Sequence, residues 1–420
     1  MEPVINYHAL FQNPTEKAFV HRLALDAKTE RVLKDASTKV QNTLRPLLKQ
    51  LAEKNGLQWP LTEPQFRPQG SSVYKTQNAP AHTPEQQVDM DLGVYIAAAF
   101  FEATITLDSA RGAVRRSLPA GALAKAYFAL VDKALRGLCN VEGWRYAEGE
   151  AKKDTCCRID LTSEGVHAHI DVPLYAAPNE QFERAALMFR RMTMDSVQFT
   201  AAKADLSSEL DRDGWDELKV VVMATRDGEW NESDVQVTIK HFKDAMNDSG
   251  HPFVLRKLWR YVKAWRDQNW KDGGGPSSIL IMEAVNRILD PTQKEIRDLL
   301  GSGREDILLQ FIFERLPAQL SVPVIVHWGR EPEDLNRGTS DAKAQWRELA
   351  RQCGANLTRA GGDAQLTAGQ VISLVLERFG ARIPRDESLI KIARAAVPFL
   401  AATPKSHPDP QQRIHRTTGA

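Results

Sequence analysis

The chain has 420 residues, enough for about two or three domains, and its hydrophobic fraction of 42% is sufficient for a packed core. Its formal net charge of +1 gives no global attraction to nucleic acid or to membranes. The sequence has no run near 18 consecutive apolar residues, no leader-like N-terminus and no disulfide-type cysteine spacing, so we expect a cytoplasmic protein that requires neither membrane nor nucleic acid.

The first half of the chain alternates between helical and strand patterns. Apolar residues at helical spacing from Thr15 to Asn55 predict a long amphipathic helix, or a broken pair, that ends near Gly56. A second helix is predicted over Ala120–Leu138. Two runs of strand character, Cys156–Leu161 and His167–Ala176, are separated by a turn and predict a hairpin.

Between the first two helices lies a stretch that combines a glycine-serine turn with two aspartates. Val88, Met90 and Leu92 alternate with Asp89 and Asp91, so a strand here projects both carboxylates from one face. Two adjacent carboxylates repel each other and need a hard cation or full solvation. Magnesium accepts one or two carboxylates together with substrate phosphates.

The turn itself, Gly70-Ser71, suits a phosphate. A glycine lets the backbone approach closely, and the serine offers its amide and its hydroxyl as donors. Either motif alone is common as a wet strand face or a plain turn, whereas the two together in this order indicate a site for a nucleoside triphosphate.

A third acidic residue, Asp171, stands between Ile170 and Val172 in the second strand of the predicted hairpin. An acid with apolar neighbours in a strand usually has a charged partner, although a solvated or capping role is the simpler alternative. Three carboxylates on adjacent strands can hold two magnesium ions, with Mn²⁺ as a substitute.

These segments resemble a known family. QGSSVYKT, QQVDMDLGVYI and HIDVPLYA are similar to the bacterial cGAS/DncV-like nucleotidyltransferases, and they most resemble the DncV-type cyclic GMP-AMP synthase branch. The resemblance implies an α/β fold, with a polymerase-beta-like core sheet, a helical second lobe and an active site in the cleft between them. It also implies that Asp89, Asp91 and Asp171 are catalytic metal ligands and that Gln69, Gly70, Ser71 and Tyr74 lie at the nucleotide.

The resemblance extends into the second half of the chain. The segment Leu255–Trp270 is similar to the first helix of the family's second lobe; its apolar stripe should leave Lys257 and Lys263 elsewhere on the surface, and Lys263 matches a family lysine that contacts the triphosphate. The following glycine-rich segment enters a helix, where Ser277, or alternatively Ser278, matches a triphosphate-binding serine.

The remaining segments complete the expected domain plan. Helices are predicted over Thr367–Phe379 and Asp386–Leu400, and a family acidic residue near the base corresponds to Asp334. The plan is a catalytic lobe over residues 1–235, a helical lobe over 236–402 and a disordered tail over 403–420. Relatives in some antiphage operons are conjugated through their C-terminus by ubiquitin-transfer-like enzymes, which suggests Ala420 as a conjugation point; an ordinary frayed end is the alternative.

The sequence thus predicts a nucleotidyltransferase that makes a cyclic GMP-AMP-like dinucleotide, or a short cyclic oligonucleotide, from ATP and GTP by two-metal phosphoryl transfer. The resemblance implies a role in antiphage signalling with a downstream effector that responds to the product. Two alternatives stay open: a metal-dependent nucleotide-sugar glycosyltransferase, which shares the Asp-x-Asp pair, and a non-catalytic nucleotide sensor on the same fold.

Overall fold

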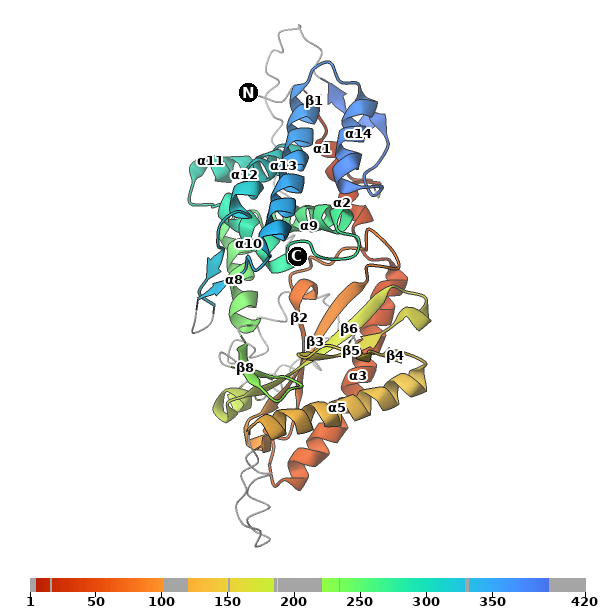
Figure 1. Ribbon diagram of the computed structural model, residues 1–420, viewed down its shortest axis with the longest axis vertical. Coiled ribbons are helices and arrows are strands. Elements are labelled where there is room, and N and C mark those ends of the chain that lie inside the picture. The colour runs from red at the N-terminus through yellow and green to blue at the C-terminus, as the bar shows by residue number, and fades with distance from the viewer. Residues whose placement is uncertain are drawn as a thin grey trace, which may run out of the picture.

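A computed structural model describes residues 5–15, 17–101, 120–149, 152–184, 187, 221–233, 235–328 and 332–392. These residues form a lobe built on a mixed sheet and a lobe of helices, one above the other in Figure 1. None of the helices in these ranges is both long enough and apolar enough to cross a bilayer. The tail over 403–420, with Ala420, lies outside the described residues.

The sheet has the strand order β2-β3-β6-β5-β4, and β7 and β8 extend it beside the second half of β6. Strands β3 and β6 run parallel, and the other neighbours are antiparallel. The predicted hairpin is confirmed as the pair β5–β6. The strands are β2 (Gln65–Gln69), β3 (Val88–Ala97), β4 (Arg145–Tyr146), β5 (Cys156–Asp160), β6 (Ala168–Ala177), β7 (Val221–Ala224) and β8 (Trp230–Ser233).

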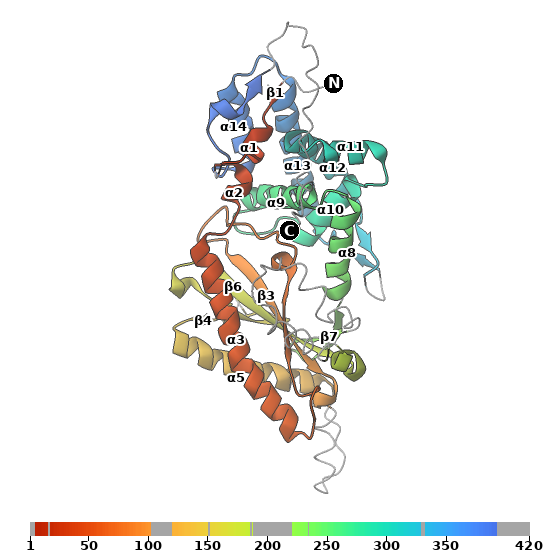
Figure 2. The same ribbon diagram turned by 180° about the vertical axis from the view of Figure 1, so that it is seen from behind.

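Helices α3 (Ala27–Lys54) and α5 (Ala120–Glu142) cover one face of this sheet, and Figure 2 shows α3 lying across it. The helical pattern predicted over Thr15–Asn55 forms two separate helices, α2 (Phe19–Arg22) and α3. Helix α3 begins where the Asp26 side chain accepts a hydrogen bond from the Thr29 amide. The alternate residues Val88, Leu92, Val94 and Ile96 of β3 pack into the core beneath these helices. Asp89 and Asp91 consequently lie on the opposite face, as the alternation predicts.

The helical lobe has one continuous core around α9, in which Trp259, Tyr261 and Trp265 are fully buried. Its small strands pair as β9–β10, and β1 pairs with β11. The helices are α8 (Val235–Asp248), α9 (Pro252–Asn269), α10 (Ser278–Ile288), α11 (Lys294–Gly301), α12 (Glu305–Gln319), α13 (Ser340–Gly362) and α14 (Ala368–Phe379), and the small strands are β1 (Ile5–Asn6), β9 (Ile325–Val326), β10 (Glu333–Asp334) and β11 (Lys391–Ile392).

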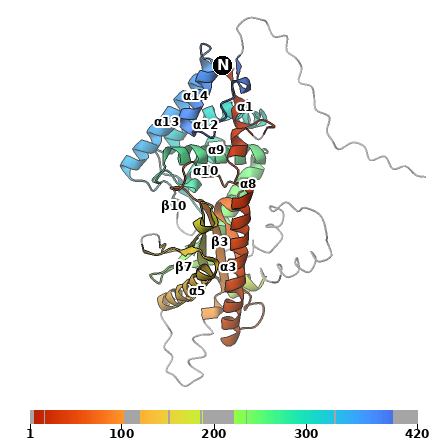
Figure 3. The same cartoon turned by 90° about the vertical axis from the view of Figure 1, so that its right-hand side faces the viewer.

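The N-terminal segment lies with the helices, away from the sheet. Helices α1 (His8–Phe11) and α2 (Phe19–Arg22) carry Phe11 and Phe19 into the helical core, where the Phe19 and Tyr261 rings stack 5.5 Å apart. Figure 3 shows α1 beside α14 while α3 runs along the sheet. We therefore propose a boundary that differs from the expected 1–235: the helical lobe takes residues 5–23 in addition to α8–α14, because their apolar side chains are buried there.

One expected helix is wrong in its first part. The segment expected to be helical from Asp386 begins with a single 3-10 turn, Glu387–Leu389, and continues as β11. Strand β11 pairs with β1, so backbone hydrogen bonding to the N-terminal strand replaces the helix there. The rest of that expected helix lies outside the described residues.

Candidate active site

Strand pairing brings the three predicted carboxylates together. In the parallel pair β3–β6, Asp91 is the register partner of Asp171, and Asp89 is the partner of His169. Neighbouring strands lie about 4.8 Å apart, and residues in register share a face. A hairpin 80 residues downstream therefore supplies the third carboxylate beside the Asp-x-Asp pair.

The glycine of the predicted turn is required by a close contact. Gly70 begins the 3-10 turn Gly70–Ser72 with φ +60°, and a Cβ on it would lie 2.6 Å from Asp91 Oδ2. Only glycine combines that backbone angle with room for the carboxylate. The turn thus positions Asp91 directly, and its next residue, Ser71, lines the cavity described below.

The carboxylates have opposite pKa shifts. Burial, followed by the charges of Asp89 and Asp171, raises the pKa of Asp91 to about 7. For Asp89, partial burial raises the pKa, but the neighbouring His169 ring and the Arg158 charge outweigh it and leave the pKa below its usual range. Burial and the two neighbouring carboxylates therefore destabilise the charged form of Asp91, and a divalent cation bound beside it would favour that charged form. Oxygen donors on one face fit magnesium or manganese.

Arg158 is a site residue that the sequence analysis missed. It lies on β5 in register with Asp171, and its Nε and Nη2 donate to the two carboxylate oxygens at 2.6 Å each. This bidentate contact fixes the orientation of Asp171. The signal available in the sequence was an arginine in the first strand of the hairpin, CCRID, but the register that opposes it to Asp171 was not predicted.

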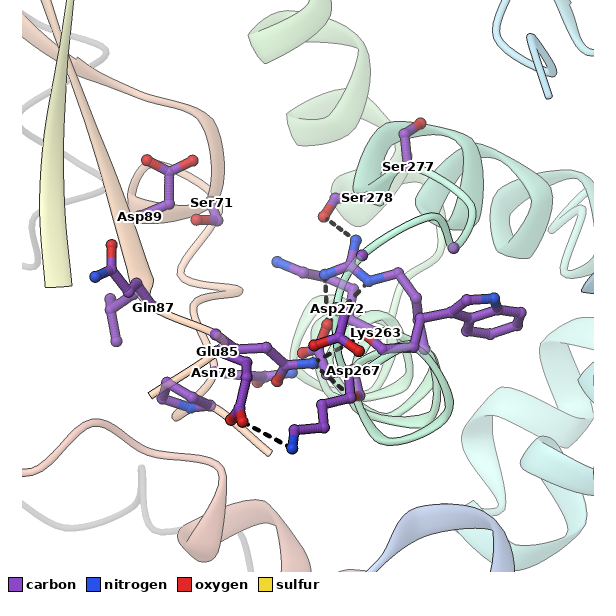
Figure 4. Close-up of a pocket in the computed structure, with 18 of the residues that line it drawn as sticks. Ser71, Asn78, Glu85, Gln87, Asp89, Lys263, Asp267, Asp272, Ser277 and Ser278 are labelled. Atoms are coloured by element: carbon purple, nitrogen blue, oxygen red, sulfur yellow. Dashed lines mark hydrogen bonds and ion pairs between the residues drawn. The ribbon is translucent and has the colours of Figure 1, made fainter. Parts of the chain in front are cut away.

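A cavity of about 470 Å³ opens beside the carboxylates, between β3, the segment 77–87, α9 and the start of α10. Figure 4 shows Ser71 and Asp89 on one wall and Ser277 and Ser278 on the other. Both walls therefore present groups that suit a phosphate chain and its cation. The lining residues are Ser71, Gln77, Asn78, Pro80, Glu85, Gln86, Gln87, Val88, Asp89, Lys263, Arg266, Asp267, Trp270, Lys271, Asp272, Gly273, Gly274, Gly275, Pro276, Ser277 and Ser278.

Lys263 lines this cavity but is buried, whereas the sequence predicted a surface position. Its Nζ donates to the carbonyl oxygen of Thr76 at 2.7 Å, across the junction of the lobes. Burial, with the nearby Arg266 charge, lowers the pKa of Lys263 to about 7. The apolar stripe of α9 is confirmed, but the neighbouring lobe covers the face that carries Lys263. Lys257 is largely covered too, in an ion pair with the buried Glu305.

The two candidate serines have different roles at the start of α10. Ser277 is the N-cap residue, and its Oγ accepts from the Leu280 amide at 3.2 Å. Ser278 Oγ lies 2.7 Å from Nη1 of Arg266, which donates to it. The exposed amides of a helix N-terminus attract anions. Arg266 adds a guanidinium there, although it is also ion-paired with Asp267. Arg266 is a second cavity residue that the sequence analysis missed.

Four of the predicted nucleotide residues are not part of the cavity lining, and one of them is Gly70, which contacts Asp91 as described above. Gln69 is buried under the site, where its Nε2 donates to the Tyr95 hydroxyl and its Oε1 accepts from the Tyr175 hydroxyl. Tyr74 is buried against Phe242. Asp334 Oδ1 accepts from the amides of Val324 and Asn336 and so stabilises the β9–β10 connection.

Comparisons with known proteins agree with this geometry. Residues 64–175 match the model of the Cyclic GMP-AMP synthase DncV-like nucleotidyltransferase domain, and residues 253–392 match the Cyclic GMP-AMP synthase C-terminal domain. The chain is 30% identical to a cyclic GMP-AMP synthase of Escherichia coli strain TW11681, over 84% of this chain and 75% of that protein. It is 32% identical to the Vibrio cholerae serotype O1 cyclic GMP-AMP synthase, over 83% of this chain and 74% of that protein.

Solved structures share the fold. The V. cholerae DncV cyclic AMP-GMP synthase in complex with the linear intermediate 5′ pppA(3′,5′)pG superposes with a TM-score of 0.68 at 21% identity, covering 94% of this chain and all of that one. E. coli DncV in its 3′-deoxy GTP bound form gives a TM-score of 0.63 at 23% identity, covering 92% of this chain and 99% of that one. The expected architecture of a nucleotidyltransferase sheet with a helical lobe is confirmed.

Proposed function

The chain belongs to the family of DncV-like cyclic GMP-AMP synthases and is a nucleotidyltransferase, and from this premise we propose that it joins ATP and GTP into a cyclic GMP-AMP-like dinucleotide with release of pyrophosphate. The observation that supports the proposal most is the meeting of Asp89, Asp91 and Asp171 on one sheet face, where Asp89 lines a cavity that the N-terminus of α10 also lines. The family favours this chemistry over nucleotide-sugar transfer.

In this proposal Asp89, Asp91 and Asp171 hold two Mg²⁺ ions, for which Mn²⁺ can substitute. When bound, such ions activate an attacking hydroxyl and neutralise the triphosphate and the leaving pyrophosphate. Gly70 keeps the Asp91 carboxylate in place, and Arg158 does the same for Asp171. These contacts preorganise the carboxylates before substrate arrives.

The phosphate chain is proposed to lie along the cavity, from Ser71 to the N-terminus of α10. Ser71 can donate its hydroxyl, and Ser277 and Ser278 line the cavity at the N-terminus of α10, where a helix favours an anion. Lys263 is already held within reach by Thr76. A triphosphate would favour the charged form of that lysine, because an opposite charge raises the pKa of a buried amine.

The test is the double substitution Asp89→Asn and Asp91→Asn, with Asp244→Asn as the control. Asp244 is a half-exposed carboxylate of α8 outside this cavity. Products from labelled ATP and GTP are separated by chromatography and digested with linkage-specific nucleases, and thermal unfolding checks the fold. We expect no product from the double variant, an unchanged fold, and full synthesis by the control. Normal synthesis by the double variant would exclude these aspartates as the metal site.

We further propose that the product serves antiphage signalling by activating a cyclic-nucleotide-responsive effector, and that Ala420 is attached to other molecules by ubiquitin-transfer-like enzymes. Support comes from the family resemblance. Co-expression with the neighbouring operon genes, followed by mass spectrometry of the C-terminal peptide, tests the attachment. A free Ala420 carboxylate in every peptide, with activity unaffected by removing the last few residues, would count against it.

A further inference from the structure

A buried histidine points into the carboxylate cluster without a hydrogen-bond partner on that side. His169 is 7% exposed and lies on β6 in register with Asp89. Its Nε2 is 3.0 Å from Asp89 Oδ1, yet this nitrogen makes no hydrogen bond with any described residue. A buried ring nitrogen without a hydrogen bond is costly unless something else occupies its lone pair.

The other ring nitrogen fixes which atom faces the cluster. His169 Nδ1 lies 2.9 Å from Gln87 Oε1, an acceptor, so Nδ1 is the nitrogen that holds the proton whenever the ring is neutral. The lone pair of Nε2 then faces the Asp89 carboxylate. Two electron-rich atoms at this distance need a cation or a proton between them. A second group that orients the ring through its far nitrogen is also the usual environment of a histidine that binds a metal.

We propose that His169 Nε2 is a metal ligand beside Asp89 and Asp171, so that this site favours a divalent cation that accepts imidazole, such as Mn²⁺, over Mg²⁺. The inference rests on the proposed carboxylate metal site and adds a nitrogen ligand to it.

The donor atoms are close enough for this role. One ligand atom from each of Asp89, His169 and Asp171 lies within 4.8 Å of the other two. Ligands that bind a cation at about 2.1 Å are separated by roughly 3 to 4 Å, so only small closing movements are needed. Asp171 can still bind a metal although Arg158 donates to both of its oxygens, because each carboxylate oxygen has a second lone pair.

The ligand set has a chemical consequence. Oxygen-only sites suit Mg²⁺, Ca²⁺ and Mn²⁺, whereas imidazole suits transition metals and is a poor ligand for Mg²⁺. Removing Nε2 should therefore weaken Mn²⁺ binding and leave Mg²⁺ binding almost unchanged. A role restricted to an imidazolium–carboxylate ion pair predicts something different: loss of the ring charge would change the affinity for both cations together.

The experiment measures binding of the metal alone to the full chain. Mn²⁺ is titrated while electron paramagnetic resonance follows the free ion, and Mg²⁺ affinity comes from its competition with Mn²⁺. The variant is His169→Asn, whose side-chain amide can keep the contact with Gln87 but cannot reach the Nε2 position. The control is His167→Asn, an exposed histidine two residues away. We expect about a tenfold or larger loss of Mn²⁺ affinity in the first variant only, with Mg²⁺ affinity changed less than about twofold.

The other outcomes each overturn a stated point. Unchanged Mn²⁺ affinity in His169→Asn, or an equal loss for both metals, would refute the nitrogen ligand. The double variant Asp89→Asn, Asp91→Asn separates failure of the nitrogen ligand from failure of the proposed function. If this variant binds both metals like the parent protein, the carboxylates do not form the metal site. A second variant, His169→Gln, guards against misfolding, because it places an amide near the Nε2 position and should retain Mg²⁺ binding.

Discussion

Replacing Gly70 by alanine tests whether the turn positions Asp91. The new Cβ would lie 2.6 Å from Asp91 Oδ2, whereas ordinary contacts begin at 3.4 Å, so the carboxylate must move by about 0.8 Å (3.4 minus 2.6). A misplacement of about 1 Å at a reacting centre costs roughly 100-fold in rate, which is about 2.7 kcal/mol. We therefore expect Gly70→Ala to lower the rate of pyrophosphate release from ATP and GTP by about two orders of magnitude.

The backbone angle has a separate cost that needs its own control. Alanine at φ +60° costs about 1 to 2 kcal/mol of folding free energy whatever its neighbours. Gly56 has φ +83° with no atom within 4 Å of its added Cβ, so Gly56→Ala imposes the same kind of strain without the contact. Both variants should lose similar stability in urea unfolding, and only Gly70→Ala should lose activity.

Two results would refute the reasoning. Activity of Gly70→Ala within about threefold of the parent protein would show that Asp91 tolerates the displacement or is not a ligand. An equal loss of rate in Gly56→Ala would show that backbone strain, and not the contact with Asp91, is responsible.

Three further predictions test other features. The pKa of Lys263 is about 7 in the folded protein and 10.5 ordinarily, so between these pH values the unfolded state binds more protons than the folded state. The free energy of unfolding without ligand should therefore rise with pH from 7 toward 10. Urea unfolding should show that this rise disappears in Lys263→Met. Arg226→Met leaves the largely buried Asp132 without its ion pair and should lower the free energy of unfolding in urea by about 3 kcal/mol. The double variant Arg226→Met, Asp132→Asn should lose less stability than the two single variants lose together. Asp334→Ala should cost about 1 to 2 kcal/mol in the same assay through its two amide contacts, and a changed ATP-to-GTP preference would instead place Asp334 at the base.

Local patterns predicted those parts of the fold that depend on local geometry. Alternation along β3 placed Asp89 and Asp91 on the face away from the core. The glycine-rich segment was correctly identified as the entry to a helix, and the structure shows that Ser277 caps it. The apolar neighbours of Asp171 and the family resemblance both predicted it as a metal ligand, and the structure places it in register with Asp91. Whether these residues bind metal and nucleotide stays a prediction.

Features that depend on long-range pairing were missed. Arg158 lies opposite Asp171, and His169 lies opposite Asp89, because of the register between strands β3, β6 and β5. The alternation of residues within one strand does not specify that register. Lys263 was expected at the surface because its helix was considered alone. In the structure it is buried, and its Nζ donates to the carbonyl of Thr76 from the other lobe. Tertiary contact decides such positions.

The order of synthesis matters for a lobe whose pieces come from both ends of the described chain. Residues 27–97, 120–149, 152–177 and 221–233 can build the sheet core while later residues are still being translated. Phe11 and Phe19 must wait for α9 and α14, and β1 must wait for β11. From residue 23 to residue 392 the ribosome adds about 370 residues, which takes roughly 20 to 75 s at 5 to 20 residues per second. Until α9 has been made these first apolar residues have no partners in the helical core, and the helical lobe can be completed only after Ile392 has been made.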